Sequence, residues 1–283
     1  MRFASVIDDG GWLDVVVRDG TYLPLESEDT GPGGIRGIAA GGASGLSRVS
    51  SWVQAQPERA WRSLDRVEEI GTPIEPRTIF TIGENYRPPG ATADSKPLRP
   101  LVYGKAMASA MTGGPGLVSW DRSLTANVDA ECELGVVIGE LAWQVQAEDA
   151  MRHVFGYTIV NDISSRDPWL DGDQWLLGKS MNGFCPVGPW IVTANELDPN
   201  DLRLGCTINE EAIQDGRTAD MRFSIAEIIT YLSRHLTLSP GDLIATGTPA
   251  RLTTPPGPDR HLEPGDVVTA WIEGIGELTT TIA

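Results

Sequence analysis

Residues 128–138 have the sequence Val128-Asp129-Ala130-Glu131-Cys132-Glu133-Leu134-Gly135-Val136-Val137-Ile138, in which spaced acids lead into an apolar run. The apolar run predicts a strand that enters a core. Because a strand turns successive side chains to opposite faces, Glu131 and Glu133 are predicted to point the same way. Neighbouring carboxylates repel each other unless a cation or a proton lies between them. With Asp129 on the same strand and Asp162 a short way downstream, these acids predict a cage for a divalent metal.

The identity of the metal follows from the hardness of its ligands. The chain has no CxxC or HxxxH motif, and its three histidines, His153, His235 and His261, are scattered. Ligation by oxygen alone favours Mg²⁺, Mn²⁺ or Ca²⁺ over zinc. Such a site leaves octahedral positions open for water or for a chelating substrate. The alternative is an acidic edge strand with solvated carboxylates, since spaced acids are common on exposed faces.

The composition is that of an ordinary globular protein. A chain of 283 residues, with 41% hydrophobic and 22% charged residues, can bury the core of one large domain or of two. The net charge of −17 and the absence of clustered Lys and Arg argue against a nucleic-acid partner, because phosphates need basic patches.

Targeting signals are also absent from the sequence pattern. The first nine residues hold no long apolar core before the acids Asp8 and Asp9, so no signal peptide is predicted, and no apolar run reaches the roughly 18 residues of a membrane span. The three cysteines, Cys132, Cys185 and Cys206, are widely spaced and odd in number. We therefore expect reduced thiols and a cytoplasmic protein, with Cys132 facing the core.

The first seventy residues predict a small α/β unit. Residues 2–25 alternate apolar and polar side chains, with Asp-Gly turns at residues 9–10 and 19–20, which is typical of short antiparallel strands. Residues 44–56 predict a helix that is capped by Ser44 and ends before Pro57. The pattern changes near residues 70–76, which predicts a small N-terminal domain over residues 1–72 and a catalytic domain over residues 73–283.

From Ile79 onward, short apolar strands alternate with Gly- and Pro-rich turns, and few helices interrupt them. This pattern predicts an α+β, β-rich fold closed by long connections. The predicted strands include residues 134–138, 154–161, 190–193, 243–246 and 267–272, and the predicted helices are residues 147–153 and 225–236.

Several segments together resemble the fumarylacetoacetate hydrolase family, in the order in which that family has them. They begin with Ile82-Gly83-Glu84-Asn85-Tyr86, continue through residues 129–134, 156–167, 174–180, 184–190 and 238–249, and end with residues 262–268 and 274–276. The resemblance covers about residues 79–283. It implies a mixed β-roll catalytic domain, a homodimer, and Mg²⁺ or Mn²⁺ held by three carboxylates, which correspond here to Glu131, Glu133 and Asp162.

The resemblance also assigns roles to residues outside the metal ligands. Lys179 corresponds to the buried catalytic lysine beside the metal, and Asp129 to an acid near the site. The substrate-binding candidates are Thr248, in the turn Thr246-Gly247-Thr248-Pro249, and Gln214, Arg166 and Gln174. Without the resemblance, Lys179 and Gln214 would be taken for surface residues, and the turn at Thr248 for tight-turn geometry alone.

The chain departs from the family pattern in the lid. Many members follow Asn-Tyr with x-x-His-x-x-Glu, a dyad that activates the attacking water, whereas Pro89 and Thr92 occupy those positions here. Neither residue can act as a general base, and Pro88-Pro89 disfavours a short lid helix. Asn182 stands where an aspartate is usual, and Arg251 replaces a common glycine and is expected to narrow the pocket mouth.

The expected substrate is a small 2-oxo acid or 1,3-dicarbonyl acid that chelates the metal and reacts through an enolate. The first expectation is hydrolytic C–C cleavage, as for an acylpyruvate. It requires another base, and Glu84, Asp242 or a histidine such as His261 is available. Isomerisation, tautomerisation or decarboxylation is the alternative, because these reactions need only the metal and a proton shuttle such as Lys179. A non-catalytic scaffold is a third reading, which the retained acids argue against.

Overall fold

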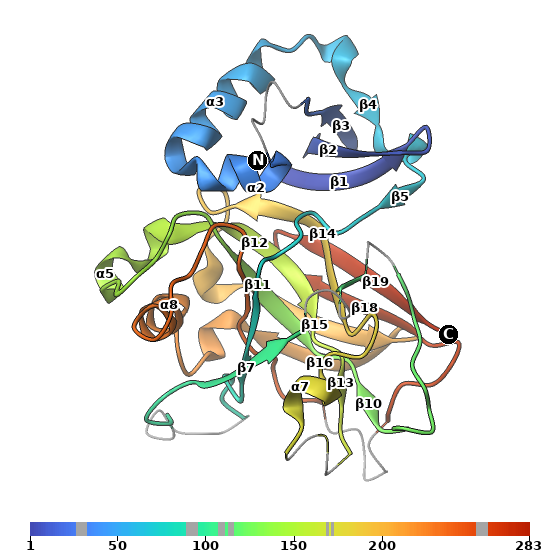
Figure 1. Cartoon of the computed structure of the whole chain (residues 1–283). Helices are drawn as coiled ribbons and strands as arrows, with labels where there is room; N and C mark the ends of the chain where they lie inside the picture. Colours follow the sequence, from blue (N-terminus) through green and yellow to red (C-terminus); the bar gives the residue numbers. More distant parts are fainter. Residues whose placement is uncertain are drawn as a thin grey trace.

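A computed structural model of the chain describes residues 1–26, 33–88, 96–106, 111–112, 116–167, 170, 173–252 and 260–283. The described residues up to residue 70 form a smaller block, called the upper block below, which lies above a larger β-rich body formed by the later residues (Figure 1). The fold is α+β and rich in strands, as the sequence predicts. Among the described residues, no helix combines the length and apolar character needed to cross a bilayer.

The amino-terminal strands are those predicted from the alternating pattern. β1 (Arg2–Asp8), β2 (Gly11–Arg18) and β3 (Thr21–Pro24) pair antiparallel in sequence order. The two intervening turns need left-handed backbone, with φ values of 75° at Gly10 and 73° at Gly20. Glycine adopts this conformation without steric cost, which explains the two Asp-Gly pairs.

The predicted helix of residues 44–56 begins earlier than expected. α3 spans Gly42–Ala55 and its N-cap is Gly41, so the prediction that Ser44 caps the helix is wrong. Gly41 is also the C-cap of α2 (Gly34–Ala40), and this single residue joins the two helices without room for a separate cap. The end before Pro57 is confirmed, because Gln56 is extended as proline requires of the residue before it.

Short elements then lead the chain from the upper block into the body. They are η1 (Glu58–Ala60), β4 (Arg62–Ser63), η2 (Leu64–Arg66) and β5 (Glu69–Ile70). β4 pairs with β3, and β5 pairs with β1.

One large sheet runs through both blocks in the order β4-β3-β2-β1-β14-β12-β11-β17-β6-β7. The junction is the antiparallel pairing of β1 with β14, which aligns Arg2 with Val192 and Phe3 with Ile191. The strands of the body are β14 (Cys185–Thr193), β12 (Val154–Asn161), β11 (Cys132–Ile138), β17 (Leu243–Ala245), β6 (Ile79–Gly83) and β7 (Leu101–Lys105), and β8 (Met111–Thr112) pairs with β14.

A second sheet packs against this one in the order β16-β15-β18-β19-β9. Its strands are β16 (Glu211–Arg217), β15 (Arg203–Ile208), β18 (Val267–Ile272), β19 (Gly276–Ile282) and β9 (Leu117–Val118). The core between the sheets includes Leu134 and Ile159 from the first sheet and Leu204 from the second. Cys132 belongs to the same core, which confirms that it faces away from the carboxylates.

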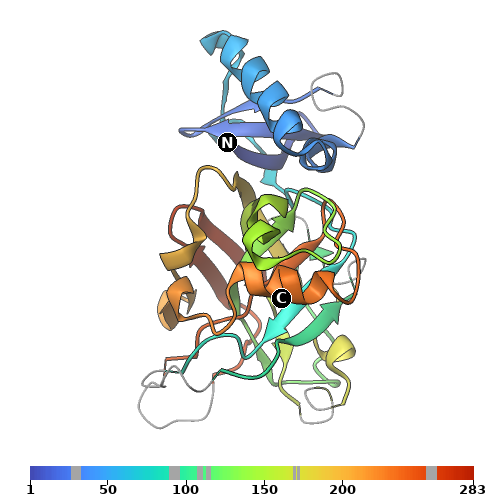
Figure 2. The same cartoon turned by 90° about the vertical axis from the view of Figure 1, so that its left-hand side faces the viewer.

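The strand predictions hold with small changes of boundary. β12 and β18 coincide with the predicted ranges, β11 starts two residues earlier, and the predicted strand 190–193 is the end of the longer β14. α8 (Ile225–Ser233) ends before the predicted residue 236, and α5 (Ala147–Ala150) continues as η4 (Met151–His153). α5 and α8 lie side by side on one flank of the body (Figure 2).

The short remaining elements position the site described below. They are β10 (Val128–Asp129), which pairs with β13 (Ser164–Ser165), α7 (Trp175–Gly178), η5 (Pro199–Asp201) and η6 (Thr218–Asp220).

A separate hydrophobic cluster joins the upper block to the body. Phe3 and Ile38 of the upper block share it with Val137 and Phe155 of the body. The rings of Phe3 and Phe155 are stacked with their centroids 5.6 Å apart. The division at residues 72 and 73 stays a prediction.

Candidate metal centre

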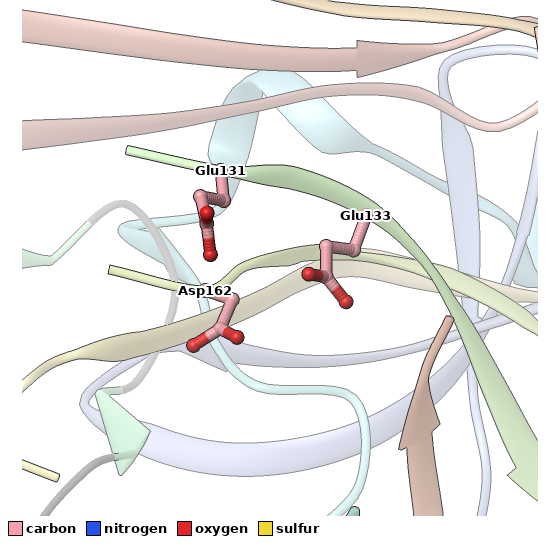
Figure 3. Close-up of side chains that lie close together, drawn as sticks. All are labelled: Glu131, Glu133 and Asp162. Carbon is pink, nitrogen blue, oxygen red and sulfur yellow. The ribbon is translucent and has the colours of Figure 1, made fainter. Parts of the chain in front are cut away.

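Glu131, Glu133 and Asp162 converge at one point of the body, with one carboxylate oxygen of each within 4.8 Å of the others. Figure 3 shows the three side chains turned toward one another. The antiparallel register of β11 and β12 explains the convergence, because it pairs Cys132 with Asn161 and Glu133 with Val160. Asp162 is the first residue after β12, and it donates its N–H to the carbonyl of Glu131 at 2.9 Å.

The expectation that Asp129, Glu131 and Glu133 lie on one strand is wrong. β10 ends at Asp129, β11 begins at Cys132, and Glu131 lies in the connection between them. The strand is interrupted here because β10 pairs with β13 whereas β11 pairs with β12. Glu131 and Glu133 still reach the same cluster, so the prediction that they point the same way is confirmed.

Glu133 is buried, and the backbone holds one of its carboxylate oxygens in place. Its Oε2 accepts the N–H of Gly247 at 2.8 Å. Burial, together with the charges of Asp162 and Glu131, raises the pKa of Glu133 well above its ordinary value. Clustered, buried carboxylates of this kind resist ionisation unless a cation joins them. The all-oxygen donor set therefore fits a hard divalent ion such as Mg²⁺.

Two buried lysines face these acids. Lys179 Nζ lies 2.7 Å from Asp162 Oδ2, 3.2 Å from Glu131 Oε2 and 2.7 Å from Ser164 Oγ. Burial alone lowers the pKa of Lys179, but the charges of Asp162, Glu131 and Glu133 outweigh it, and the pKa is raised. Lys179 is therefore protonated at neutral pH.

Lys105 is the second lysine, and the sequence reasoning missed it. Its ammonium is ion-paired with Asp162 Oδ1 and donates to the carbonyl of Ile163 at 3.0 Å. Burial raises the pKa of Asp162, but the charges of Lys105 and Lys179 lower it overall. A signal was available, because the chain has only three lysines and Lys105 ends a strand.

Asp129 lies beside the three-carboxylate cluster but outside it, as the resemblance implies. Its Oδ2 accepts Arg166 Nε at 3.1 Å, and its Oδ1 lies 2.7 Å from Arg251 Nη1 and 2.8 Å from His261 Nδ1. Burial raises the pKa of Asp129, but the charges of Arg251 and Arg166 and the contact with His261 lower it overall. Arg166 is also ion-paired with Glu131.

Gln214 and Thr248 meet at the wall of the site. Gln214 is buried, and its Oε1 accepts the N–H of Cys132 at 2.9 Å. Its Nε2 donates to Thr248 Oγ1 at 2.7 Å and to the carbonyl of Pro249 at 2.9 Å. Thr248 Oγ1 in turn donates to the carbonyl of Cys132 at 2.8 Å. Both side chains are thus used to hold the turn.

These residues surround a cavity of about 470 Å³. The carboxylates, Lys179, Arg166 and Arg251 form its charged side. An apolar side includes Ile82, Leu101, Tyr103 and Trp175, and the rings of Tyr103 and Trp175 are stacked 4.3 Å apart. Gln174 is exposed at the start of α7, and Trp175 rather than Gln174 lines the cavity.

The remaining base candidates have different positions. Glu84 lines the cavity, whereas Asp242 does not and instead accepts the N–H of Ser239 at 2.7 Å. Pro89 and Thr92, which occupy the lid positions, lie outside the described residues.

Comparison with known proteins gives a consistent picture. Residues 78–283 match the family model described as fumarylacetoacetate (FAA) hydrolase C-terminal. An uncharacterized protein of Staphylococcus aureus is 38% identical over 222 residues, which is 78% of this chain and 74% of that protein.

Solved structures resemble the chain over its whole length. A fumarylacetoacetate hydrolase from Exiguobacterium antarcticum is 30% identical with a TM-score of 0.84, and covers 100% of this chain and 99% of its own. A 5-carboxymethyl-2-hydroxymuconate delta-isomerase from Mycobacterium smegmatis is 28% identical with a TM-score of 0.78, at 100% and 98% coverage. A maleylpyruvate hydrolase from Sphingobium is 26% identical with a TM-score of 0.81, at 100% and 99% coverage.

Proposed function

The chain belongs to the fumarylacetoacetate hydrolase family, and from this premise we propose that it is a Mg²⁺-dependent enzyme that hydrolyses a C–C bond of a small 2-oxo acid or 1,3-dicarbonyl acid. The observation that carries the proposal is the convergence of Glu131, Glu133 and Asp162 within 4.8 Å on a cavity of about 470 Å³. Mn²⁺ or Ca²⁺ would suit the same donors.

The metal and the protein contribute different parts of the chemistry. When bound by these three carboxylates, the ion supplies a Lewis acid for the negative charge that develops on the substrate's keto oxygen. Lys179, held protonated between Glu131 and Asp162, adds a fixed positive charge at the same place and can give a proton to the departing carbon.

Hydrolysis also needs a base that activates water. Pro89 and Thr92 cannot serve, so the base must come from elsewhere in the wall. Glu84 lines the cavity, and His261 pairs with Asp129, which also lines it. Either group could accept a proton from water, and a positioned base typically contributes about 10²–10⁴ in rate.

Isomerisation or decarboxylation of a 2-oxo diacid is the second candidate. It is favoured by Pro89 and Thr92 in the lid positions, because neither reaction needs an activated water. The structural similarity to a protein described as a delta-isomerase also supports it.

A panel of substrates with added Mg²⁺ distinguishes the candidates. The purified protein is assayed with an acylpyruvate, with oxaloacetate and with an unsaturated 2-hydroxy diacid. Cleavage of the acylpyruvate that Glu131→Ala abolishes supports hydrolysis, and turnover of only the other compounds supports the second candidate. Tight Mg²⁺ binding with no turnover of any compound would instead favour a non-catalytic scaffold.

The family resemblance also motivates a proposal about assembly and location. We propose that the protein is a cytoplasmic homodimer whose only substrates are small molecules. Light scattering coupled to size-exclusion chromatography measures the mass in solution, and a mass near 30.5 kDa would rule out the dimer.

A further inference from the structure

The charges around the cavity differ from those of the chain as a whole. The chain has 39 acids against 22 Lys and Arg residues. In the described wall of the cavity, by contrast, five carboxylates face four cations, and buried Lys105 adds a fifth cation through its pair with Asp162. The acids are Glu84, Asp129, Glu131, Glu133 and Asp162, and the wall cations are Arg166, Lys179, Arg222 and Arg251.

This balance leaves room for two negative charges once a divalent ion is bound. The side chains alone sum to zero, so the ion's two charges remain to be matched. Buried charges are costly unless they are paired. A monocarboxylate supplies one of the two missing charges and a dicarboxylate supplies both.

Arg251 is the wall cation best placed to receive the second carboxylate. Arg166 is committed to Asp129 and to the ligand Glu131, whereas Arg251 touches none of the three candidate ligands. Its described contacts are Asp129 Oδ1, 2.7 Å from Nη1, and the carbonyl of Arg260, which Nη2 donates to at 2.7 Å. A guanidinium has five N–H donors in a planar fork that suits carboxylates, so donors remain after these contacts.

The main chain holds Arg251 in this position. It forms an isolated bridge with Gln214, and the next residue, Leu252, donates its N–H to the carbonyl of Ile213 at 2.8 Å. The side chain is a quarter exposed and lines the cavity next to Pro249 and Ala250. Because both the main chain and the guanidinium of Arg251 already have protein contacts, the side chain needs little reordering when an anion binds.

We propose that Arg251 binds a second carboxylate of the substrate, remote from its 2-oxo acid group, and thereby selects dicarboxylates over monocarboxylates of the same length. This inference rests on the proposed function, because it assumes that the 2-oxo acid end is held at Glu131, Glu133 and Asp162.

Matched pairs of 2-oxo acids test the inference by calorimetry in the presence of Mg²⁺, without turnover as the readout. 2-Oxoglutarate is compared with 2-oxopentanoate and 2-oxoadipate with 2-oxohexanoate, so each pair differs only in the terminal carboxylate. The variants are Arg251→Gln and Arg251→Met. Arg217→Gln is the matched control, since Arg217 is exposed and bound to Asp201 outside the cavity wall. Oxalate, which needs only the metal end, reports whether each variant keeps an intact site.

We expect the wild-type protein and R217Q to bind the dicarboxylate of at least one pair about tenfold or more tightly than its partner. In both Arg251 variants this ratio should fall to about twofold or less, with oxalate affinity unchanged. A full preference that survives in R251Q or R251M, or no preference in the wild-type protein, overturns the role of Arg251. Failure of wild-type protein to bind oxalate with Mg²⁺ would overturn the proposed function itself, and the inference with it.

Discussion

Lys179 Nζ lies 2.7 Å from Asp162 Oδ2, and both side chains are buried. Lys105 occupies the other oxygen of the same carboxylate, so Asp162 is held between two ammonium groups. The cluster therefore combines carboxylates that attract a divalent ion with lysines that repel it. This opposition lets a variant separate catalysis from metal binding.

Lys179→Met is expected to lower kcat by about 10²–10⁴, because it removes a positioned proton donor and a fixed charge. The affinity for Mg²⁺ should stay the same or rise, since a positive charge 3.2 Å from Glu131 is lost. Steady-state kinetics and calorimetric Mg²⁺ titration measure the two effects. If Lys179 had only a structural role, K179M would weaken Mg²⁺ binding as well.

Glu133→Gln is expected to weaken Mg²⁺ binding by at least about 100-fold, more than is usual for changes to residues that merely support a ligand. The amide keeps the shape of the side chain and can still accept the N–H of Gly247. Thermal unfolding with and without Mg²⁺ measures the effect, because a ligand that binds the folded state raises Tm. Glu277→Gln, an exposed change of the same kind on β19, is the control and should keep the full Mg²⁺-induced rise. An equal rise in E133Q would remove Glu133 from the ligand set.

The stability of the metal-free protein should depend on pH through the same residue. The pKa of Glu133 is raised well above its ordinary value by burial and by Asp162 and Glu131, so the folded state holds a proton that the unfolded state releases. The contribution of Glu133 to the free energy of unfolding is fully present below the pKa of about 4.3 that the group has in the unfolded chain. It is lost as the pH rises toward the raised pKa of the folded state. In EDTA, wild-type protein should therefore lose stability between about pH 5 and 8 more steeply than E133Q. Denaturant titrations at each pH would contradict this if the two slopes were the same.

The sequence was sufficient to predict that the three carboxylates converge, because strand alternation and the family motifs both concern neighbouring residues. Glu131 and Glu133 are two positions apart, and Asp162 follows β12, the strand that pairs antiparallel with β11. The break in the strand at Ala130 was not predictable, because it depends on the separate partners of β10 and β11.

The surroundings of the site depend on contacts between distant residues. Asp129 meets His261 across 132 positions of sequence, and Gln214 meets Cys132 across 82. No local pattern encodes these distances, so the sequence offered His261 only as an available base, and Gln214 received its substrate-binding role only from the resemblance. The structure gives both of them protein partners, and the substrate contact of Gln214 stays a prediction.

Thr248→Val should loosen the turn that lines the cavity, since it removes the hydroxyl that bridges Gln214 Nε2 and the carbonyl of Cys132. The carbonyl of Cys132 and one N–H of the Gln214 amide lose this partner, while the amide keeps its bond to Pro249. The loss costs about 1–3 kcal/mol of unfolding free energy. KM should rise more than kcat falls, because the Thr248 hydroxyl contacts Gln214 and the carbonyl of Cys132 rather than any of the three candidate metal ligands. Thr248→Ser keeps the hydroxyl and should restore both values to near wild type. Equal effects of T248V and T248S on KM would argue that the methyl group matters and the bridge does not.

Variants of Phe3 and Phe155 can show whether the upper block and the body unfold together. Their stacked rings belong to one hydrophobic cluster that contains residues of both blocks, and both are almost fully buried. Phe155→Ala and Phe3→Ala should each lower the free energy of unfolding by about 3–5 kcal/mol. The double variant should lose less than the sum, because contacting residues couple by about 0.5–3 kcal/mol. Leu98→Ala, at a side chain that is 98% exposed, should change stability by no more than about 0.5 kcal/mol.

Each variant should unfold in a single transition by calorimetry, since the large sheet and this cluster are continuous through β1 and β14. Two separate transitions in F3A, with the second at the wild-type Tm, would instead mean that residues 1–72 fold as an independent domain.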